Sequence, residues 1–419
     1  MRIAVWHNLP SGGGKRALYN QVAGLIGRGH VVEAWCPPTV DQSYLPLSGL
    51  IEEHVVALDP SGRTDWHKRL RMEADIRIAI AAMHRHLALV AGQIRGKTFD
   101  ILLAHPCITF RAPALAQYVD LPAVLYLQEP NRAFYEALPD LHWMQASPTR
   151  VVTSLTRLRN RLGWVRQSSN TRRQATEERA NAASFDRILV NSLFSRESLL
   201  RAYGLNSTVC YLGADLSEFR DEGLDRAHQV IGLGSFTREK NVAFIVRALA
   251  CLDPPRPALV WVGNAADRVV LADAIALAAD LGVEFKPLLR ITDQALVTLL
   301  NTSAAMLYAP RLEPFGLAPI EAAACGLPVV AVAEGGVRET VINQVTGILV
   351  EADPAAMAAA LAPILADPAQ AKRLGQNGRR IALEQWSNEA ATTRLEQQLQ
   401  LVVAAGRKAG IADRELPPE

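Results

Sequence analysis

The chain has 419 residues, of which 49% are hydrophobic and 21% charged, with five cysteines and a net charge of +2. This composition excludes a disordered chain, and the length suits two or three domains. The cysteines are scattered without a C-x-x-C pair, which argues against a disulfide framework or a cysteine zinc site and indicates reduced, buried thiols in a cytosolic protein. The N-terminal apolar stretch is too short for a signal peptide, and no run of about 18 apolar residues predicts a membrane span.

Charge is unevenly distributed along the chain. Residues 1–212 carry 25 basic and 17 acidic side chains, a net charge of +8, whereas residues 213–419 carry 19 and 25, a net charge of −6. A basic first half is typical of a protein that meets an anionic partner, although the asymmetry also arises by chance.

In chain order, the first half alternates short apolar runs, predicted as strands, with segments of helical spacing. A glycine-rich turn, Pro10 to Lys15, follows the first strand. The predicted strands are 2–6, 31–35, 101–104, 123–127 and 187–190, and the predicted helices are 17–27, 66–95 and 148–183.

The same alternation resumes after a polar stretch at 214–223. Here the predicted strands are 230–233, 259–262, 283–285, 305–308 and 329–332, and the predicted helices are 242–250, 266–281, 293–301, 319–324 and 355–366.

Two successive sets of alternating elements predict an α/β protein with two doubly wound parallel-sheet domains. We expect an N-terminal acceptor-binding domain at 1–212, a linker at 213–228 and a C-terminal nucleotide-sugar-binding domain at 229–385. A C-terminal helix and tail, 386–419, is expected to pack back on the N-terminal domain. Because ligands of such sheets bind at the carboxyl ends of the strands, we expect the site between the two domains.

The strongest functional signal is the segment from Glu313 to Glu321, which reads E-P-F-G-L-A-P-I-E. It leads into the helix predicted from Pro319, whose N-terminus would present N–H groups and a positive dipole end to an anion. Gly316 would let the backbone approach a ligand closely. We expect Glu313 to project into the cleft and Glu321 to accept hydrogen bonds from vicinal hydroxyls. The alternative is a solvated loop charge and a carboxylate that only stabilises the helix dipole.

With the residues that follow, this segment resembles the signature of the retaining, family-4-like glycosyltransferases of the GT-B superfamily, the glycosyl transferases group 1. That signature is E-x-F-G-L-x-x-x-E, a small-residue helix, G-x-P-V-V-A and G-G-x-x-E, and the chain supplies G-L-P-V-V-A at 326–331 and G-G-V-R-E at 335–339. The resemblance covers nearly the whole chain and includes the segments 12–14, 28–31, 191–198 and 211–215. It implies two facing Rossmann-like domains and a nucleoside diphosphate sugar as the donor.

The resemblance also implies which residues of the C-terminal half bind the donor. Glu321 is implied to bind the ribose, and Glu313 to contact sugar hydroxyls and stabilise the charge that develops during transfer. Lys240 matches a lysine of the family, whereas Ser235 stands where the family usually has arginine and Arg238 is the candidate substitute. The alternative is that Lys240 and Arg238 are solvated charges of this loop. The remaining expected donor-binding residues are Gly263, Phe315, Gly316 and Leu317.

In the N-terminal half, Gly13 and Gly14 follow the first strand and are implied to approach the donor phosphates; the alternative is a tight turn. Many relatives have a histidine where this chain has Gln128, at the end of strand 123–127. Glutamine cannot take a proton, so Glu129 and His105, which is expected to end the preceding strand, are further candidates near the reacting centre. The alternative for His105 is a structural role. The resemblance implies that the leaving phosphate deprotonates the acceptor, which needs no protein base.

Neither a D-x-D pair nor clustered histidines and cysteines are found in the sequence, so we expect no cofactor and no metal. Residues 150–187 contain nine arginines and three acids. They predict a basic amphipathic helix that binds an anionic membrane face, where lipid-linked acceptors lie; the alternative is a solvated basic helix. We expect a cytoplasmic protein, peripheral at the inner membrane face, with no nucleic-acid partner.

The predicted function is the metal-independent, retaining transfer of a sugar to a sugar or lipid-linked glycan acceptor, in cell-surface polysaccharide or glycolipid synthesis. Within enzymes, the alternative is a related GT-B catalyst such as a sugar epimerase or phosphorylase. Outside enzymes, the alternative is a non-catalytic pseudo-glycosyltransferase that binds a nucleotide, a glycan or a partner protein. Ser235 and Gln128, which depart from the family pattern, keep that alternative open.

Overall fold

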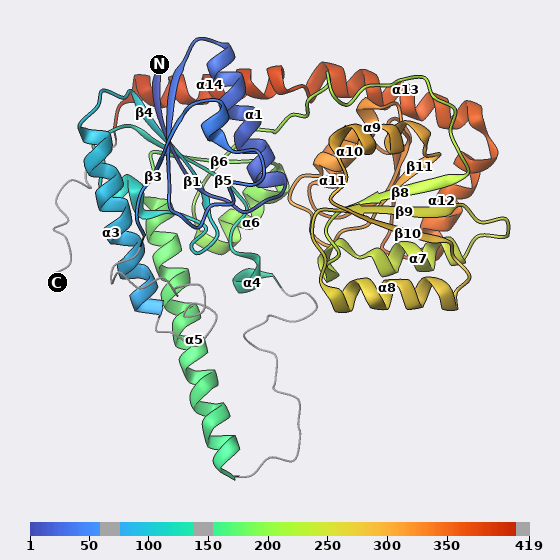
Figure 1. Cartoon of the computed structure of the whole chain (residues 1–419), viewed down its shortest axis with the longest axis horizontal. Helices are drawn as coiled ribbons and strands as arrows, with labels where there is room; N and C mark the ends of the chain where they lie inside the picture. Colours follow the sequence, from blue (N-terminus) through green and yellow to red (C-terminus); the bar gives the residue numbers. More distant parts are fainter. Residues whose placement is uncertain (59–75, 137–153, 408–419) are drawn as a thin grey trace. The chain divides into compact units, whose positions relative to one another are not determined.

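The computed structural model describes residues 1–58, 76–136 and 154–407, and only the backbone of 154–166 (Figure 1). By internal contacts the chain divides into two compact units. Unit 1 comprises Met1–Val190, Arg196–Cys210 and Arg394–Glu419, and unit 2 comprises Asn191–Ser195 and Tyr211–Thr393. The short piece Asn191–Ser195 groups with unit 2, although it lies inside the range predicted for the N-terminal domain.

Unit 1 is built on a parallel sheet of seven strands in the order β3-β2-β1-β4-β5-β6-β7. Its central strands are apolar runs buried on both faces, as expected for a parallel sheet covered by helices. The strands are β1 (Arg2–Asn8), β2 (Val31–Cys36), β3 (Glu52–Val55), β4 (Ile101–Cys107), β5 (Ala123–Gln128), β6 (Arg187–Val190) and β7 (Thr208–Val209).

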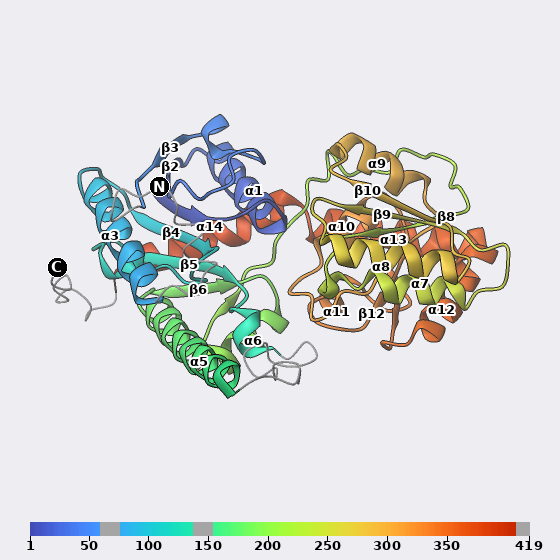
Figure 2. The same ribbon diagram turned by 60° about the horizontal axis from the view of Figure 1, so that its bottom comes forward.

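Helices cover both faces of this sheet (Figures 1 and 2). On one face, α3, α5 and α6 pack with the short helix η2; on the other lie α1 and the C-terminal helix α14. The helices of unit 1 are α1 (Gly13–Gly27), η1 (Leu47–Gly49), α3 (Ile76–Arg95), η2 (Ala114–Gln117), α4 (Arg132–Tyr135), α5 (Ser154–Ala183), α6 (Leu193–Tyr203, whose first turn groups with unit 2) and α14 (Asn388–Ala405, whose residues up to Thr393 group with unit 2).

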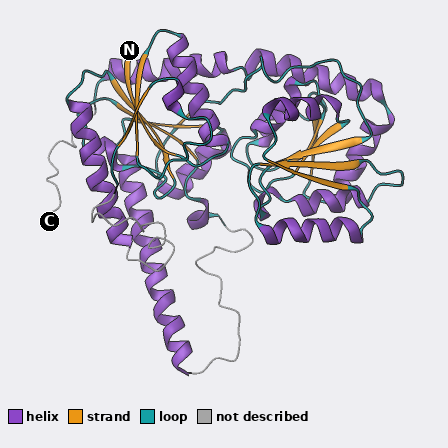
Figure 3. Ribbon diagram, in the orientation of Figure 1, coloured by secondary structure: helices purple, strands orange, loops and turns teal. Residues whose placement is uncertain are grey.

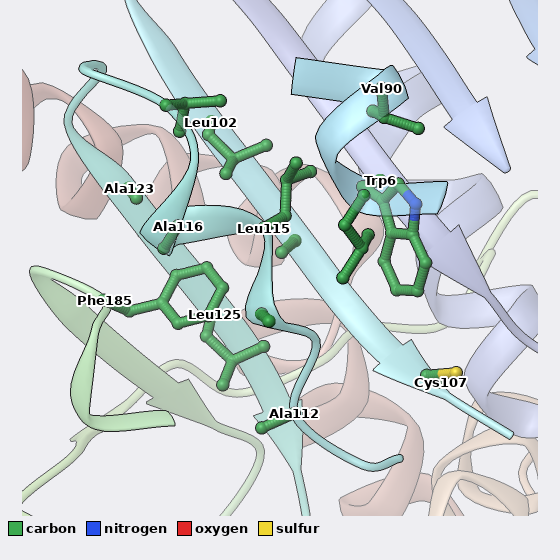
Figure 4. Packing of buried hydrophobic residues seen from close by; sticks show 14 of the residues in the cluster. Trp6, Val90, Leu102, Cys107, Ala112, Leu115, Ala116, Ala123, Leu125 and Phe185 are labelled. Carbon is green, nitrogen blue, oxygen red and sulfur yellow. The ribbon is translucent and has the colours of Figure 1, made fainter. Parts of the chain in front are cut away.

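Large apolar side chains fill the space between the sheet and α3 (Figure 4). Trp6 on β1 is completely buried, and its indole Nε1 donates to Nε2 of His86 on α3 at 3.3 Å. Val90 from α3 and Leu115 from η2 join the same cluster. This core fixes β1, so the loop that follows Asn8 leaves the sheet from a rigid strand end.

Unit 2 is built on a parallel sheet of six strands in the order β10-β9-β8-β11-β12-β13. In both sheets the strand order therefore reverses beside the first strand, β1 or β8. Sheets with this topology bind ligands at the carboxyl ends of their strands. The strands are β8 (Gln229–Leu233), β9 (Ala258–Gly263), β10 (Phe285–Leu289), β11 (Ala305–Tyr308), β12 (Val329–Val332) and β13 (Gly347–Val350).

Helices lie on both faces of the sheet of unit 2 (Figure 3). Two apolar clusters, one on each face, hold them to the sheet. Helices α7, α8 and α12 pack on one face, and α9, α10 and α11 on the other. Asp353 and Asp367 cap helices that begin with proline, a favoured combination at a helix start. The helices are η3 (Arg238–Lys240), α7 (Val242–Ala250), α8 (Arg268–Asp280), α9 (Asp293–Thr302), α10 (Leu317–Ala324), α11 (Val337–Thr340), α12 (Pro354–Ala366) and α13 (Pro368–Gln385).

Some predicted elements differ from the observed ones. The helix predicted from residue 17 begins at Gly13, so the glycine triplet forms its first turn rather than a loop before it. The strand predicted at 283–285 lies at Phe285–Leu289, where Pro287 is accommodated because β10 is an edge strand. Strands β3, β7 and β13 were not predicted.

Parts of two predicted helices, 66–75 and 148–153, lie outside the described residues. Among the described helices none is long and apolar enough to cross a membrane. Four cysteines are buried, as predicted, but Cys251 is exposed at the end of α7.

Candidate functional site

The predicted donor-binding residues of unit 2 gather at the carboxyl ends of β8, β9 and β11. Gly263 ends β9 and contacts the loop after β8, because a β-carbon at Gly263 would lie 2.6 Å from the carbonyl oxygen of Gly234. Gly234 has a φ of 149°, and a β-carbon there would lie 2.9 Å from the side chain of Lys240. Glycine at both positions therefore lets the loop fold down over the strand ends and sets the place of Lys240.

Lys240 and Glu313 form an ion pair at the centre of this region. The Nζ atom of Lys240 lies 2.7 Å from Oε2 of Glu313, with the two side chains 31% and 15% exposed. Burial, followed by the charges of Glu313 and Glu321, raises the pKa of Tyr308, at the end of β11, well above its ordinary value. Tyr308 therefore stays neutral. Arg238, in the same turn as Lys240, is exposed.

The turn after Glu313 opens helix α10. Gly316 has a φ of 100° and precedes the first helical residue, Leu317, while the ring of Phe315 is buried. The first N–H groups of a helix have no partner within it, so this turn offers hydrogen-bond donors and a positive dipole end. Glu321 lies one turn further along α10 and is 9% exposed.

A second pair of glycines holds this turn from the other side. The N–H of Gly336 donates to the carbonyl oxygen of Glu313 at 2.7 Å. A β-carbon at Gly335 would lie 2.3 Å from that same oxygen, and one at Gly336 would lie 2.3 Å from the carbonyl oxygen of Pro314. Gly335 and Gly336 were not among the predicted site residues, although they stand inside the G-G-x-x-E part of the signature.

In unit 1, Gly14 lies in the first turn of α1 beside the end of β5. A β-carbon at Gly14 would contact the side-chain amide of Gln128 at 3.5 Å. Gln128 has a φ of 66°, and its buried Nε2 finds no hydrogen-bond partner among the described residues. Gly13 is exposed in the same turn. The structure therefore brings three predicted residues of the N-terminal half together around an amide group with unused hydrogen-bonding capacity.

Glu129 follows Gln128 and lies between two arginines. Its Oε1 is 3.7 Å from a guanidinium nitrogen of Arg111, and its Oε2 is 3.8 Å from Nε of Arg132. The two guanidinium groups balance the negative charge of the Glu129 carboxylate. This carboxylate is suited to orient a hydroxyl group by accepting its hydrogen bond.

The position of His105 differs from the expected one. Strand β4 continues to Cys107, so residue 105 lies within the strand instead of at its end. The imidazole is completely buried and stacks on Tyr126, with ring centroids 5.7 Å apart. Burial, and then the nearby His7, lowers the pKa of His105 to about 3. His105 is therefore a neutral core residue of unit 1, not a side chain at the strand end.

Stability at low pH should reveal this buried imidazole. In the unfolded chain His105 takes up a proton below its ordinary pKa of 6.5, whereas in the folded chain it does so only near about 3. Stability that is present above pH 6.5 is therefore lost as the pH falls towards 3, at up to about 1.4 kcal/mol per pH unit. We expect His105→Phe to reduce the slope of unfolding free energy against pH between about pH 6 and pH 4 in urea titrations.

His228→Phe is the matched control, because His228 is exposed and should leave the slope unchanged. Some slope should remain in His105→Phe, because burial also lowers the pKa values of His7 and His86. An undiminished slope in His105→Phe would contradict the buried, neutral state of this residue.

Among the described residues, the fold brings together two groups of side chains that could act as metal ligands, although the members of each group are not adjacent in the sequence. They are His7 with Cys36 and Glu53, and Glu33 with Glu52 and His54. In each group a lysine already balances acidic charge, since Lys97 donates to Glu33 and the charge of Lys15 acts on Glu53. A cation would compete with these ammonium groups. Metal independence nevertheless stays a prediction.

Comparison with known proteins gives a match to the family glycosyl transferases group 1 over residues 217–381. The chain is 28% identical over 237 residues to the alpha-1,3/1,6-mannosyltransferase ALG2 of Homo sapiens, covering 50% of this chain and 57% of that protein. It is 33% identical over 234 residues to a D-inositol 3-phosphate glycosyltransferase of Salinispora arenicola, covering 48% and 51%. The chain thus spans about half the length of the curated relatives it matches.

Solved structures resemble the whole chain. Sucrose-phosphate synthase from Thermosynechococcus elongatus matches with a TM-score of 0.72 at 20% identity, covering 97% of this chain and 100% of that one. HepE of Anabaena, in complex with UDP and glucose, matches with a TM-score of 0.68 at 18% identity, covering 96% and 99%. At these identities the likeness shows the fold. Residues 217–381 thus match the model of the glycosyl transferases group 1, and the chain has the GT-B fold, with one Rossmann-like domain in each unit.

Proposed function

We propose that the protein transfers a sugar from a nucleoside diphosphate sugar to a sugar or lipid-linked glycan acceptor, with retained anomeric configuration and without a metal. The observation that carries the proposal is the Lys240–Glu313 pair beside the N-terminus of α10, with Glu321 one turn into that helix. An ammonium group and a helix N-terminus suit a diphosphate, and the two carboxylates suit ribose and sugar hydroxyls. The glycosyltransferase relatives support the reaction class.

In the proposed reaction, the diphosphate of the donor binds Lys240 and the N–H groups of Gly316 and Leu317. The bond between the anomeric carbon and the phosphate oxygen breaks, and the acceptor oxygen bonds to that carbon on the same face. The acceptor proton passes to the leaving phosphate oxygen, so no protein base is required. Glu313 stabilises the positive charge that develops on the sugar, while the amide of Gln128 and the carboxylate of Glu129 orient the acceptor.

We further propose that the acceptor is part of a cell-surface polysaccharide or glycolipid and that the protein works in the cytoplasm at an anionic membrane face. The nine arginines within 150–187 support this proposal, although residues 150–153 and the side chains of 154–166 lie outside the described part of the chain. Binding should require vesicles that contain anionic lipid and should weaken with salt. Absence of binding at low salt would refute the membrane part alone.

A thermal-shift screen with uridine, guanosine and adenosine diphosphates tests the donor site. One of them should raise the melting temperature, because a ligand at 100 times its Kd adds about 2.7 kcal/mol to the stability of the folded state. The matching nucleotide sugars should then be turned over, and EDTA should leave the rate unchanged. A thermal shift without turnover of any sugar would favour the non-catalytic pseudo-glycosyltransferase. The Lys240–Glu313 pair could then still bind a nucleotide without catalysing transfer.

A further inference from the structure

The carboxylate of Glu339, on the short helix α11, accepts hydrogen bonds from segments far away in the sequence. Its Oε2 accepts from the N–H of Leu193 at 2.8 Å, and its Oε1 accepts from the N–H of Phe194 at 3.0 Å. The hydroxyl of Tyr211 also donates to Oε2, at 2.9 Å. Because the two N–H groups open helix α6, the helix dipole favours the negative charge at this position.

The segments held by Glu339 in turn contact the loop Glu313–Gly316. The hydroxyl of Ser192, next to Leu193, donates to the carbonyl oxygen of Pro314 at 2.5 Å. The ring of Tyr211 lies beside the buried ring of Phe315, with centroids 6.0 Å apart. Glu339 therefore reaches both the backbone and the aromatic anchor of this loop, in each case through one intermediate residue.

The same segments are the places where the chain passes from one unit to the other. It crosses after Val190, after Ser195 and after Cys210, and finally after Thr393. The first three crossings flank Asn191–Ser195 and Tyr211, which are the pieces that Glu339 binds or adjoins. A single carboxylate of unit 2 thus connects these crossings to the loop that carries Glu313.

We propose that Glu339 is a positioning residue for glycosyl transfer, which holds the loop Glu313–Gly316 in place through Ser192 and Tyr211. This inference rests on the proposed function and deepens it, because it assigns a role to a residue that the donor does not need to touch. A small displacement of Glu313 should weaken contacts made in the transition state, while Lys240 and Glu321 still hold the nucleotide. The loss of Glu339 should therefore affect kcat more than KM for the donor.

The test compares Glu339→Ala and Tyr211→Phe with the wild-type chain. We expect Glu339→Ala to lower kcat about 10- to 100-fold with KM for the donor changed less than about threefold. Tyr211→Phe, which removes a single hydroxyl, should shift kcat in the same direction by less. Hydrogen–deuterium exchange of the peptide containing 313–318 should become faster in both variants.

The control is Glu197→Ala, because Glu197 lies on the same helix α6 in an exposed ion pair with Arg201, with 65% and 64% exposure. It should change neither kcat nor exchange. If Glu339 served only as a helix cap, its loss would lower the melting temperature while kcat per folded molecule and exchange at 313–318 stayed the same, and the proposal would be overturned.

Exchange measurements separate this inference from the proposed function. Faster exchange in Glu339→Ala, together with a wild-type chain that turns over no nucleotide sugar, would refute glycosyl transfer and support the positioning of the loop. Unchanged exchange and unchanged kcat in Glu339→Ala, with an active wild type, would refute the positioning role alone.

Discussion

Replacing Glu313 with glutamine is expected to lower kcat by about 10²- to 10³-fold, the range found when a preorganised electrostatic contact to the transition state is removed. Glutamine keeps the shape and hydrogen-bonding capacity of the side chain but not its charge. Lys240, which lies 2.7 Å from Glu313, is 31% exposed and can be solvated, so folding should be unaffected. Initial rates and melting temperatures measure the two effects.

A second ion pair in unit 2 provides the matched control. Lys286 and Glu284 are also 2.7 Å apart, but their side chains are 51% and 64% exposed and lie beside edge strand β10, away from the strand ends that hold Glu313. Because exposed pairs contribute little, Glu284→Gln should leave both kcat and melting temperature unchanged. Comparable kcat values for Glu313→Gln and Glu284→Gln would exclude the role proposed for Glu313.

Lys240 and Glu313 should also be distinguishable by nucleotide binding. Lys240→Met removes a charge that we assign to the diphosphate, so it should reduce the thermal shift given by a nucleoside diphosphate. Glu313→Gln should preserve or increase that shift, because it releases Lys240 from its ion pair. A smaller thermal shift in Glu313→Gln and an unchanged one in Lys240→Met would show that Lys240 does not bind the diphosphate as proposed.

The central strands of both sheets could be predicted from the sequence because they are short apolar runs buried on both faces. Strands β11 and β12 were predicted with their observed ends, Ala305–Tyr308 and Val329–Val332. The edge strand β3, Glu52–Val55, has two acidic residues and no buried face, so its hydrophobic pattern gave no signal. β3 therefore lacks the periodicity on which such predictions depend.

For the candidate site, the sequence motif identified residue types but not their contacts. Lys240 and Glu313 were each expected at the donor, yet their ion pair joins residues 73 positions apart and depends on how β8 and β11 lie side by side. The contact of Glu339 with Leu193, across 146 positions, depends on tertiary packing in the same way. His105 was misplaced because a strand's last residue cannot be judged from local hydrophobicity when the following residues, Pro106 and Cys107, are also buried.

Replacing Arg226 with methionine is expected to destabilise unit 2 by about 3 kcal/mol or more. The guanidinium lies at the C-terminal ends of both α9 and α10, where burial lowers its pKa. It donates to four carbonyl oxygens, those of Leu300 at 3.1 Å, Ser303 at 2.8 Å, Cys325 at 3.1 Å and Gly326 at 3.0 Å. Methionine keeps the apolar stem but leaves these carbonyls without their donor and removes a positive charge from the negative ends of two helix dipoles.

Urea unfolding followed through the buried Trp261 of unit 2 measures this loss. Arg226→Lys should recover only part of the stability, because an ammonium group cannot reproduce the planar fork that serves both helix ends. Arg247→Met on α7 is the control, since Arg247 is exposed and its replacement should change stability by less than about 0.5 kcal/mol. Equal unfolding curves for Arg226→Met and Arg247→Met would mean that water satisfies these carbonyls. In that case, the position of α10, whose N-terminus we assign to the diphosphate, would not depend on Arg226.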